Sequence, residues 1–197
     1  MSLILASASP IRAQLLRQNQ VPLQIEPARV DEAAIKSALL AEDAPPRDIA
    51  DTLAEVKAKR VANKFPEGLV LGADQILVHG TTLIDKAPDL ATLRAQLTTL
   101  RGSAHTLLSA AVIYERNQPV WRHIGQAQMI MRDFSDTFLD AYIAQHGDDL
   151  LTTVGGYRLE TDGPSLFSRV QGDYFSVLGM PLLEVLAFLR SRGVIAE

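Results

Sequence analysis

Ser7, Ser9 and Arg12 form the first group of residues in this chain that could do chemistry. They follow a short apolar run, Leu3–Ala6, and the pair Ser9-Pro10 is typical of the N-cap and first turn of a helix. The free N–H groups at a helix start, with hydroxyls and a guanidinium beside them, can bind a phosphate group. The alternative is that Ser9 only caps the helix and that Arg12 is solvated, because Ser-Pro caps are common.

Asp74 is the second candidate, and it follows another apolar run, Leu69–Ala73. We expect it at the carboxyl end of a buried strand, where open α/β sheets bind their ligands. A carboxylate in that position can coordinate Mg²⁺ or deprotonate an attacking water. Glu32, next to Asp31, could supply a second oxygen ligand. The alternatives are an Asx-turn at Asp74 and a solvated acidic pair at Asp31-Glu32.

Two lysines could supply positive charge to the same cleft. Lys57 lies at the border of the apolar stripe of a predicted helix, and Lys86 lies in a short turn that ends at Pro88. Either could neutralise phosphate charge, although each taken alone is more typical of a surface lysine. The four histidines show no ligand spacing and no triad partner, so we assign them no role.

Helices and strands alternate along the chain, which predicts the α/β class. The predicted helices begin at Ser9-Pro10, span about Arg47–Asn63 and Leu90–Leu100, and begin again at Ser135 and Pro181. The predicted strands are Leu3–Ala6, Val21–Pro27, Leu69–Ala73, a hairpin over residues 76–84, His105–Tyr114 and Val120–Arg132. The Gly-rich stretch Gly155–Gly172 could be a phosphate-binding loop, but it lacks the order of the known Gly-rich fingerprints, and turns explain it at least as well.

Composition limits the classes of function. With 197 residues, 47% of them hydrophobic, the chain can form one domain or one two-lobed unit. A net charge of −4 without a basic run argues against binding to nucleic acid. The chain has no cysteine, which excludes disulfides and thiolate metal sites, and no apolar stretch reaches the roughly 18 residues that span a bilayer. We therefore expect a cytoplasmic protein without a membrane segment or a signal peptide.

These segments, in this order, resemble the Maf family of nucleoside triphosphate pyrophosphatases over nearly the whole chain. The matching segments are Leu5-Ala6-Ser7-Ala8-Ser9-Pro10 with Arg12, Val30-Asp31-Glu32, Leu53–Ala58 with Lys57, Gly72-Ala73-Asp74-Gln75, Lys86 before Pro88, Gly155-Gly156-Tyr157, Gly172-Asp173-Tyr174 and Gly179-Met180-Pro181-Leu182. The ordered set is highly specific, although no single segment is.

The resemblance implies one Maf-like domain over residues 1–197. Its fold would be a mixed central β-sheet flanked by helices, with two lobes around a nucleotide-binding cleft, as in inosine triphosphatases. The implied reaction hydrolyses a nucleoside triphosphate to the monophosphate and pyrophosphate with a divalent cation, Mg²⁺, Mn²⁺ or Co²⁺. Asp74 would activate water, Glu32 and Asp74 would hold the metal, and a homodimer is implied. The phosphates would be bound by Ser7, Arg12, Lys57 and Lys86.

Two positions bear on the choice of base. Gln75 and Glu160 resemble the branch of the family that acts on 7-methyl-GTP, and the Glu160 carboxylate could accept hydrogen bonds from a guanine. The chain departs from the family pattern at Ile11, at Asp85-Lys86-Ala87-Pro88 and in the stretch Tyr157–Glu160. The alternative function is a regulatory nucleotide-binding protein with little turnover, since the family is also associated with control of cell division.

Overall fold

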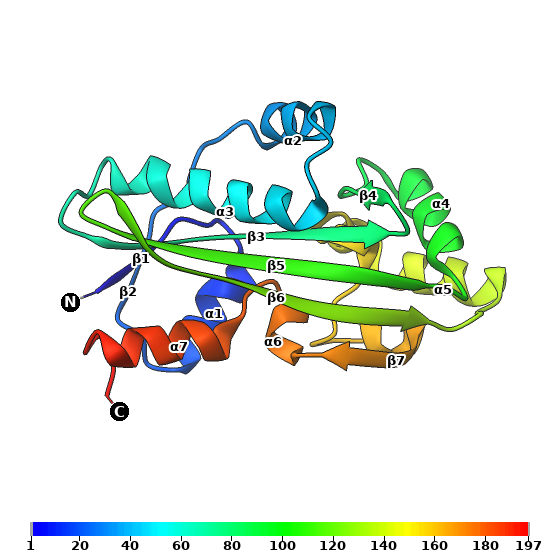
Figure 1. Ribbon diagram of the computed structural model, residues 1–197. Helices are drawn as coiled ribbons and strands as arrows, with labels where there is room; N and C mark the ends of the chain where they lie inside the picture. The colour runs from blue at the N-terminus through cyan, green and yellow to red at the C-terminus, as the bar shows by residue number, and fades with distance from the viewer. Residues whose placement is uncertain (1, 197) are drawn as a thin grey trace. The chain divides into compact units, whose positions relative to one another are not determined.

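The computed structural model describes residues 2–196, in which seven strands form a mixed β-sheet with helices packed against it (Figure 1). The strands are β1 (Leu3–Leu5), β2 (Leu23–Ile25), β3 (Leu69–His79), β4 (Thr82–Ile84), β5 (Ala104–Glu115), β6 (Gln118–Met131) and β7 (Phe167–Gly172). The α-helices are α1 (Pro10–Gln18), α2 (Glu32–Ala41), α3 (Pro46–Ala62), α4 (Leu90–Leu100), α5 (Asp136–His146), α6 (Tyr174–Val177) and α7 (Leu182–Ser191). The predicted α/β class and the mixed sheet flanked by helices are confirmed.

The sheet has the strand order β2-β1-β3-β5-β6-β7, and β4 pairs with β3 outside this path. β1 runs parallel to both of its neighbours, with Leu3 opposite Leu69 and Leu5 opposite Leu71. The pairs β3–β4 and β6–β7 are antiparallel. All three residues of β1 are buried, as expected for a strand that is paired on both edges and covered on both faces.

The chain divides into two compact units, and the first comprises Met1–Gln75, Leu108–Gly125 and Gly179–Glu197. In this unit α3 runs along one face of the strands, while α1 and α7 lie on the opposite face (Figure 1). α3 buries Ile49 and Leu53, two residues of the helical spacing that predicted it, together with Val61. Its bounds differ from the prediction by one residue at each end.

The second unit comprises Ile76–Leu107 and Gln126–Leu178. Its core includes Leu93, Leu97 and Leu100 of α4, at the three- and four-residue spacing that predicted this helix with the same bounds. Met129 and Met131 of β6 contribute to the same core. The two methionines lie on the buried face of the strand, where they alternate with the exposed Gln128 and the half-buried Ile130.

The Gly-rich stretch contains regular structure as well as turns. Short 3₁₀ helices lie at Val154–Gly156 and Gly163–Leu166, another at Gly147–Thr152 precedes the stretch, and Phe167–Gly172 forms strand β7. Five of the six residues of β7 are exposed, so the strand lacks the apolar pattern that would have predicted it.

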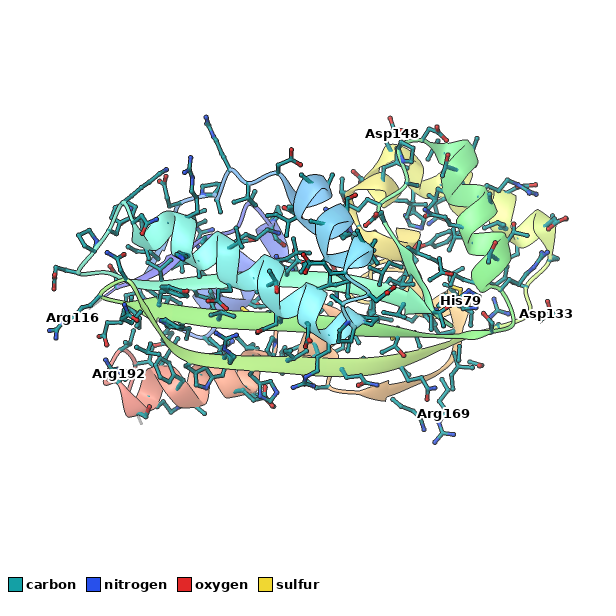
Figure 2. The ribbon with its side chains drawn as sticks, turned by 45° about the horizontal axis from the view of Figure 1, so that its top comes forward. His79, Arg116, Asp133, Asp148, Arg169 and Arg192 are labelled. Atoms are coloured by element: carbon teal, nitrogen blue, oxygen red, sulfur yellow. The ribbon has the colours of Figure 1, made fainter. Side chains whose placement is uncertain are left out.

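In the first unit, a side-chain hydrogen bond connects the C-terminal end of α7 with the end of β5. Arg192, which follows α7, donates a hydrogen bond to Glu115, the last residue of β5. Figure 2 accordingly shows Arg192 near Arg116, which begins the turn between β5 and β6. Within residues 2–196, no helix combines the length and the apolar character that crossing a bilayer requires.

Candidate active site

Lys57 lies between two carboxylates in the first unit. Its Nζ donates a hydrogen bond of 2.6 Å to Asp74 Oδ1 and lies 2.8 Å from Glu32 Oε1. The Lys57 and Asp74 side chains are only 9% and 8% exposed, whereas that of Glu32 is 48% exposed. A buried ammonium and a buried carboxylate are stable only when paired, so each requires the other. We call these three residues the Glu32–Lys57–Asp74 cluster.

Gly72 allows α3 to approach β3 closely enough to form this cluster. A Cβ at position 72 would lie 2.2 Å from the carbonyl oxygen of Ala54 and 2.6 Å from the backbone nitrogen of Ala58. Because alternate residues of a strand share a face, Gly72 and Asp74 both face α3. The missing side chain at Gly72 therefore brings the helix backbone against the strand, and Lys57 reaches Asp74.

The prediction that the strand ends before Asp74 was wrong. β3 continues without interruption from Leu69 to His79, so Asp74 lies in the middle of the strand and not at its carboxyl end. The polar residues Asp74 and Gln75 interrupt the apolar pattern, but their side chains have partners, Lys57 and Ser109. A buried polar side chain with a hydrogen-bond partner is compatible with a central strand.

Glu32 reaches the cluster because it begins α2. Asp31 is the N-cap residue of this helix, and its carboxylate accepts a hydrogen bond of 3.0 Å from the backbone N–H of Ala34. Asp31 is thus a helix cap and not merely a solvated neighbour of Glu32. Glu32 occupies the first turn of α2, where a carboxylate is favoured by the helix dipole.

Arg12 is buried beside the cluster and is held at three points. Its Nε donates to the carbonyl oxygen of Gly179 at 2.8 Å, and its Nη1 donates to the carbonyl oxygen of Ala73 at 2.9 Å and to Ser7 Oγ at 3.2 Å. Burial lowers the pKa of the guanidinium, while the nearby carboxylates of Asp74 and Glu32 act in the opposite direction. Arg12 keeps its charge, because a guanidinium is not deprotonated in proteins. It therefore brings a fixed positive charge to the site.

Ser7, and not Ser9, supplies the side-chain acceptor before α1. Ser7 Oγ accepts a hydrogen bond of 3.2 Å from the backbone N–H of Ser9, whereas the Ser9 side chain makes no capping hydrogen bond. Pro10 begins the helix as predicted. The Ser7 hydroxyl thus lies between the start of α1 and Arg12, within the group of residues that we predicted to bind phosphate.

Two further residues complete the site, and sequence reasoning gave neither a role. Ser109 on β5 is fully buried, and its Oγ accepts a hydrogen bond of 3.1 Å from Gln75 Nε2. Gly179 has a φ of +99°, and a Cβ there would lie 3.4 Å from two nitrogens of Arg12. Gly179 belongs to one of the family segments, but nothing local to Ser109 signalled its role.

Lys86 and Glu160 belong to the second unit. Lys86 follows β4 and is exposed, and Glu160 is exposed in the turn that precedes the 3₁₀ helix Gly163–Leu166. Phosphate binding by Lys86 and base recognition by Glu160 therefore stay predictions.

The carboxylate oxygens of the Glu32–Lys57–Asp74 cluster are ligands that suit a hard divalent cation. Glu32 Oε1 and Asp74 Oδ1 both point at one atom, the Lys57 Nζ, so the two oxygens converge. Within residues 2–196, no group of three or more His, Cys, Asp or Glu side chains is arranged to hold a metal ion. Mg²⁺ commonly takes one or two protein carboxylates together with phosphate oxygens of the substrate. The two carboxylates therefore fit a cation that gains its other ligands from a bound phosphate compound and water.

A comparison with protein families identifies the family of this chain. Residues 2–192 match the model of the family described as "Maf-like protein". The chain belongs to the Maf family. The segments whose sequence resembles the family include every member of the Glu32–Lys57–Asp74 cluster, together with Ser7, Arg12, Gln75 and Gly179.

Curated relatives of this Maf-like chain are similar over nearly their whole length. A nucleoside triphosphate pyrophosphatase of Ruegeria pomeroyi is 54% identical over 98% of this chain and 97% of the relative. The protein of the same name in Caulobacter vibrioides is 48% identical, over 97% and 96% of the two chains. A 7-methyl-GTP pyrophosphatase of Rhizobium meliloti is 44% identical, over 98% and 97%.

Proposed function

We propose that this Maf-like protein is a nucleoside triphosphate pyrophosphatase that prefers a guanine-type base such as that of 7-methyl-GTP. Membership of the enzyme class follows from the family and from near-full-length relatives that carry this name. The single observation that carries the chemistry is the buried Asp74 carboxylate, held by Lys57 beside the fixed guanidinium of Arg12. A carboxylate surrounded by cations is suited to a polyanionic substrate.

In the proposed reaction, water attacks the α-phosphorus and Asp74 accepts a proton from this water. The new bond joins the water oxygen to the α-phosphorus, and the bond from the α-phosphorus to the oxygen bridging to the β-phosphorus breaks. The products are the nucleoside monophosphate and pyrophosphate. Arg12, Lys57 and Lys86 offset the charge that develops on the phosphate oxygens, and the hydroxyl of Ser7 donates to one of them.

Glu32 and Asp74 are the residues that would hold the divalent cation, Mg²⁺, Mn²⁺ or Co²⁺. When bound, such a cation withdraws negative charge from the phosphate oxygens and so favours attack at phosphorus. The support for this role is the convergence of the two carboxylate oxygens on one point.

The preference for a guanine-type base is assigned to Gln75 and Glu160. A carboxylate at Glu160 can accept hydrogen bonds from the N1–H and the amino group of guanine. The relative from Rhizobium meliloti, named 7-methyl-GTP pyrophosphatase, supports this preference. Gln75 Nε2 donates to Ser109, which holds the amide in one orientation.

A panel of nucleotides tests the proposal. Pyrophosphate release is measured with Mg²⁺ or Mn²⁺ for 7-methyl-GTP, GTP, dTTP, UTP and CTP, and the values of kcat/KM are compared. We expect the highest value for 7-methyl-GTP, and we expect Glu160→Gln to reduce its advantage over UTP by roughly tenfold, because the variant loses a charged acceptor. A clear preference for a pyrimidine would overturn the assignment of the base.

The alternative is a regulatory protein that binds nucleotides with little turnover. The same experiment separates the two functions when it is combined with a binding measurement. Tight binding of every triphosphate without release of pyrophosphate from any of them would favour regulation and refute catalysis.

A further inference from the structure

Lys57 occupies the position that a cation shared by Glu32 and Asp74 would take. Its Nζ lies 2.6 Å from Asp74 Oδ1 and 2.8 Å from Glu32 Oε1. A magnesium ion held by the same two oxygens would lie at about 2.0–2.1 Å from each of them. The ammonium and the metal ion therefore cannot occupy this point together.

Electrostatics reinforces the steric conflict. The site contains two carboxylates, Glu32 and Asp74, and two cationic side chains, Lys57 and Arg12, so its charges already balance. A divalent cation that enters alone is repelled by both cationic side chains at short range. A triphosphate that enters with the cation brings about four negative charges, and the repulsion is then offset.

We propose that Lys57 is a built-in competitor of the divalent cation, so that the substrate-free protein binds the metal weakly and accepts it together with the triphosphate. This inference rests on the proposed function. When the metal–nucleotide complex arrives, the ammonium leaves the carboxylate oxygens and pairs with the phosphates. One lysine thus keeps the carboxylates paired in the free protein and binds phosphate in the complex.

The two cationic side chains differ in their freedom to make such a move. Arg12 is held by Gly179, Ala73 and Ser7, and two of these contacts are to backbone carbonyls. Lys57 carries its ammonium on a flexible four-carbon stem, and its Nζ contacts the two carboxylates that the metal ion would use. The close packing of α3 on Gly72 fixes the backbone beneath it, so the change is confined to the Lys57 side chain. The half-exposed Glu32 leaves one side of the cluster open to solvent.

Binding of Mn²⁺ alone tests this inference. The free ion is titrated into nucleotide-free protein at one near-neutral pH, and the bound fraction is measured by electron paramagnetic resonance. We expect Lys57→Met to bind Mn²⁺ at least roughly tenfold more tightly than the wild type, because the competing charge is gone. Lys59→Met is the matched control, since Lys59 is exposed on the same helix and its loss changes the net charge equally. An unchanged or weaker affinity in Lys57→Met would overturn the proposal.

Two further variants keep the result interpretable. Lys57→Gln removes the charge but keeps a hydrogen-bond donor for the buried Asp74, so it replaces Lys57→Met if circular dichroism shows that the methionine variant is unfolded. The double variant Lys57→Met with Asp74→Asn should lose the gain in affinity, because the gained ion would be bound at Asp74. A gain that persists in the double variant places the ion elsewhere and also overturns the proposal.

Failure of this inference is distinguishable from failure of the proposed function. The titration contains no nucleotide, whereas the function is tested by pyrophosphate release from the wild type. Turnover by the wild type without tighter Mn²⁺ binding in the Lys57 variants would refute only the role of Lys57 as a competitor.

Discussion

At the scale of single residues, the charge of Asp74 governs the site. Its carboxylate is the partner of the buried Lys57 ammonium and one of the carboxylates near the Arg12 guanidinium. In the proposed reaction it also accepts the proton of water. Two substitutions test this part of the site: one removes the charge of Asp74, and the other replaces the guanidinium of Arg12.

Asp74→Asn should lower kcat for pyrophosphate release by roughly 10²- to 10⁴-fold, the range expected for loss of a general base. The amide keeps the size of the side chain and can still accept a hydrogen bond from Lys57, whose ammonium also keeps the Glu32 carboxylate as its charged partner, so we expect the fold to persist. Activity is measured by pyrophosphate release and folding by circular dichroism. Turnover close to that of the wild type would refute the catalytic assignment.

Arg12→Lys should reduce both stability and kcat/KM, although it keeps the positive charge. An ammonium cannot satisfy Gly179, Ala73 and Ser7 with the geometry of the guanidinium, so buried acceptors lose their donors. We expect a loss of about 1–3 kcal/mol in the free energy of unfolding and a fall of at least roughly tenfold in kcat/KM. Arg17→Lys, exposed on the same helix, should change neither quantity appreciably. Equal behaviour of the two variants would contradict the anchoring role of Arg12.

At the scale of secondary-structure elements, the contact between α3 and β3 determines whether the cluster forms. The contact is close at Gly72, where the strand faces backbone atoms of Ala54 and Ala58. Backbone atoms cannot move aside as the end of a side chain can, so an added methyl group must displace the helix as a whole.

Gly72→Ala should therefore separate α3 from β3 and draw Lys57 away from Asp74. Overpacking of a close contact costs about 1–3 kcal/mol, and we expect a loss at the upper end of this range because the clash is with backbone. Urea unfolding measures the stability, and pyrophosphate release measures the expected loss of activity. Gly80→Ala is the control, since a Cβ there meets no atom within 4 Å, and it should cost only about 1–2 kcal/mol through its positive φ. A harmless Gly72→Ala would refute the close contact.

At the scale of the whole molecule, a buried histidine makes stability depend on pH. His105, at the start of β5, is 2% exposed, and its Nε2 lies 2.7 Å from the hydroxyl of Tyr157. Burial and, to a smaller extent, the charge of His79 lower the pKa of His105 to about 4. The unfolded chain takes up this proton near pH 6.5, whereas the folded protein does so only near pH 4.

Between these two values the unfolded state binds more protons, so the free energy of unfolding falls as the pH falls from about 6.5 to about 4. For His105 alone the loss is on the order of 3 kcal/mol. In His105→Gln this part of the pH dependence should disappear. The free energy of unfolding, measured with urea near pH 7 and near pH 4.5, should then differ less between the two pH values than it does in the wild type. His123→Gln, with a half-exposed side chain on β6, should retain the wild-type dependence. Identical pH profiles of the wild type and His105→Gln would contradict the prediction.

Much of the fold and part of the site could be predicted from local patterns. The spacing of apolar residues predicted α3 and α4 to within one residue of their bounds, and Pro10 marked the start of α1. The same patterns failed at Asp74 and Gln75, where polar residues indicated the end of a strand that continues to His79. Local pattern could not detect the partners, Lys57 and Ser109, that make these residues compatible with a buried strand.

By itself, the sequence determined the family, the α/β class and the residue types of the site, because these depend on the order and composition of segments that can be read along the chain. Only the tertiary structure decided that Lys57 lies between Glu32 and Asp74, and that Gly179 and Ala73 hold Arg12. These contacts join positions as far as 167 residues apart in the chain. Their geometry depends on how closely helices and strands pack, and at Gly72 a single absent side chain sets that distance.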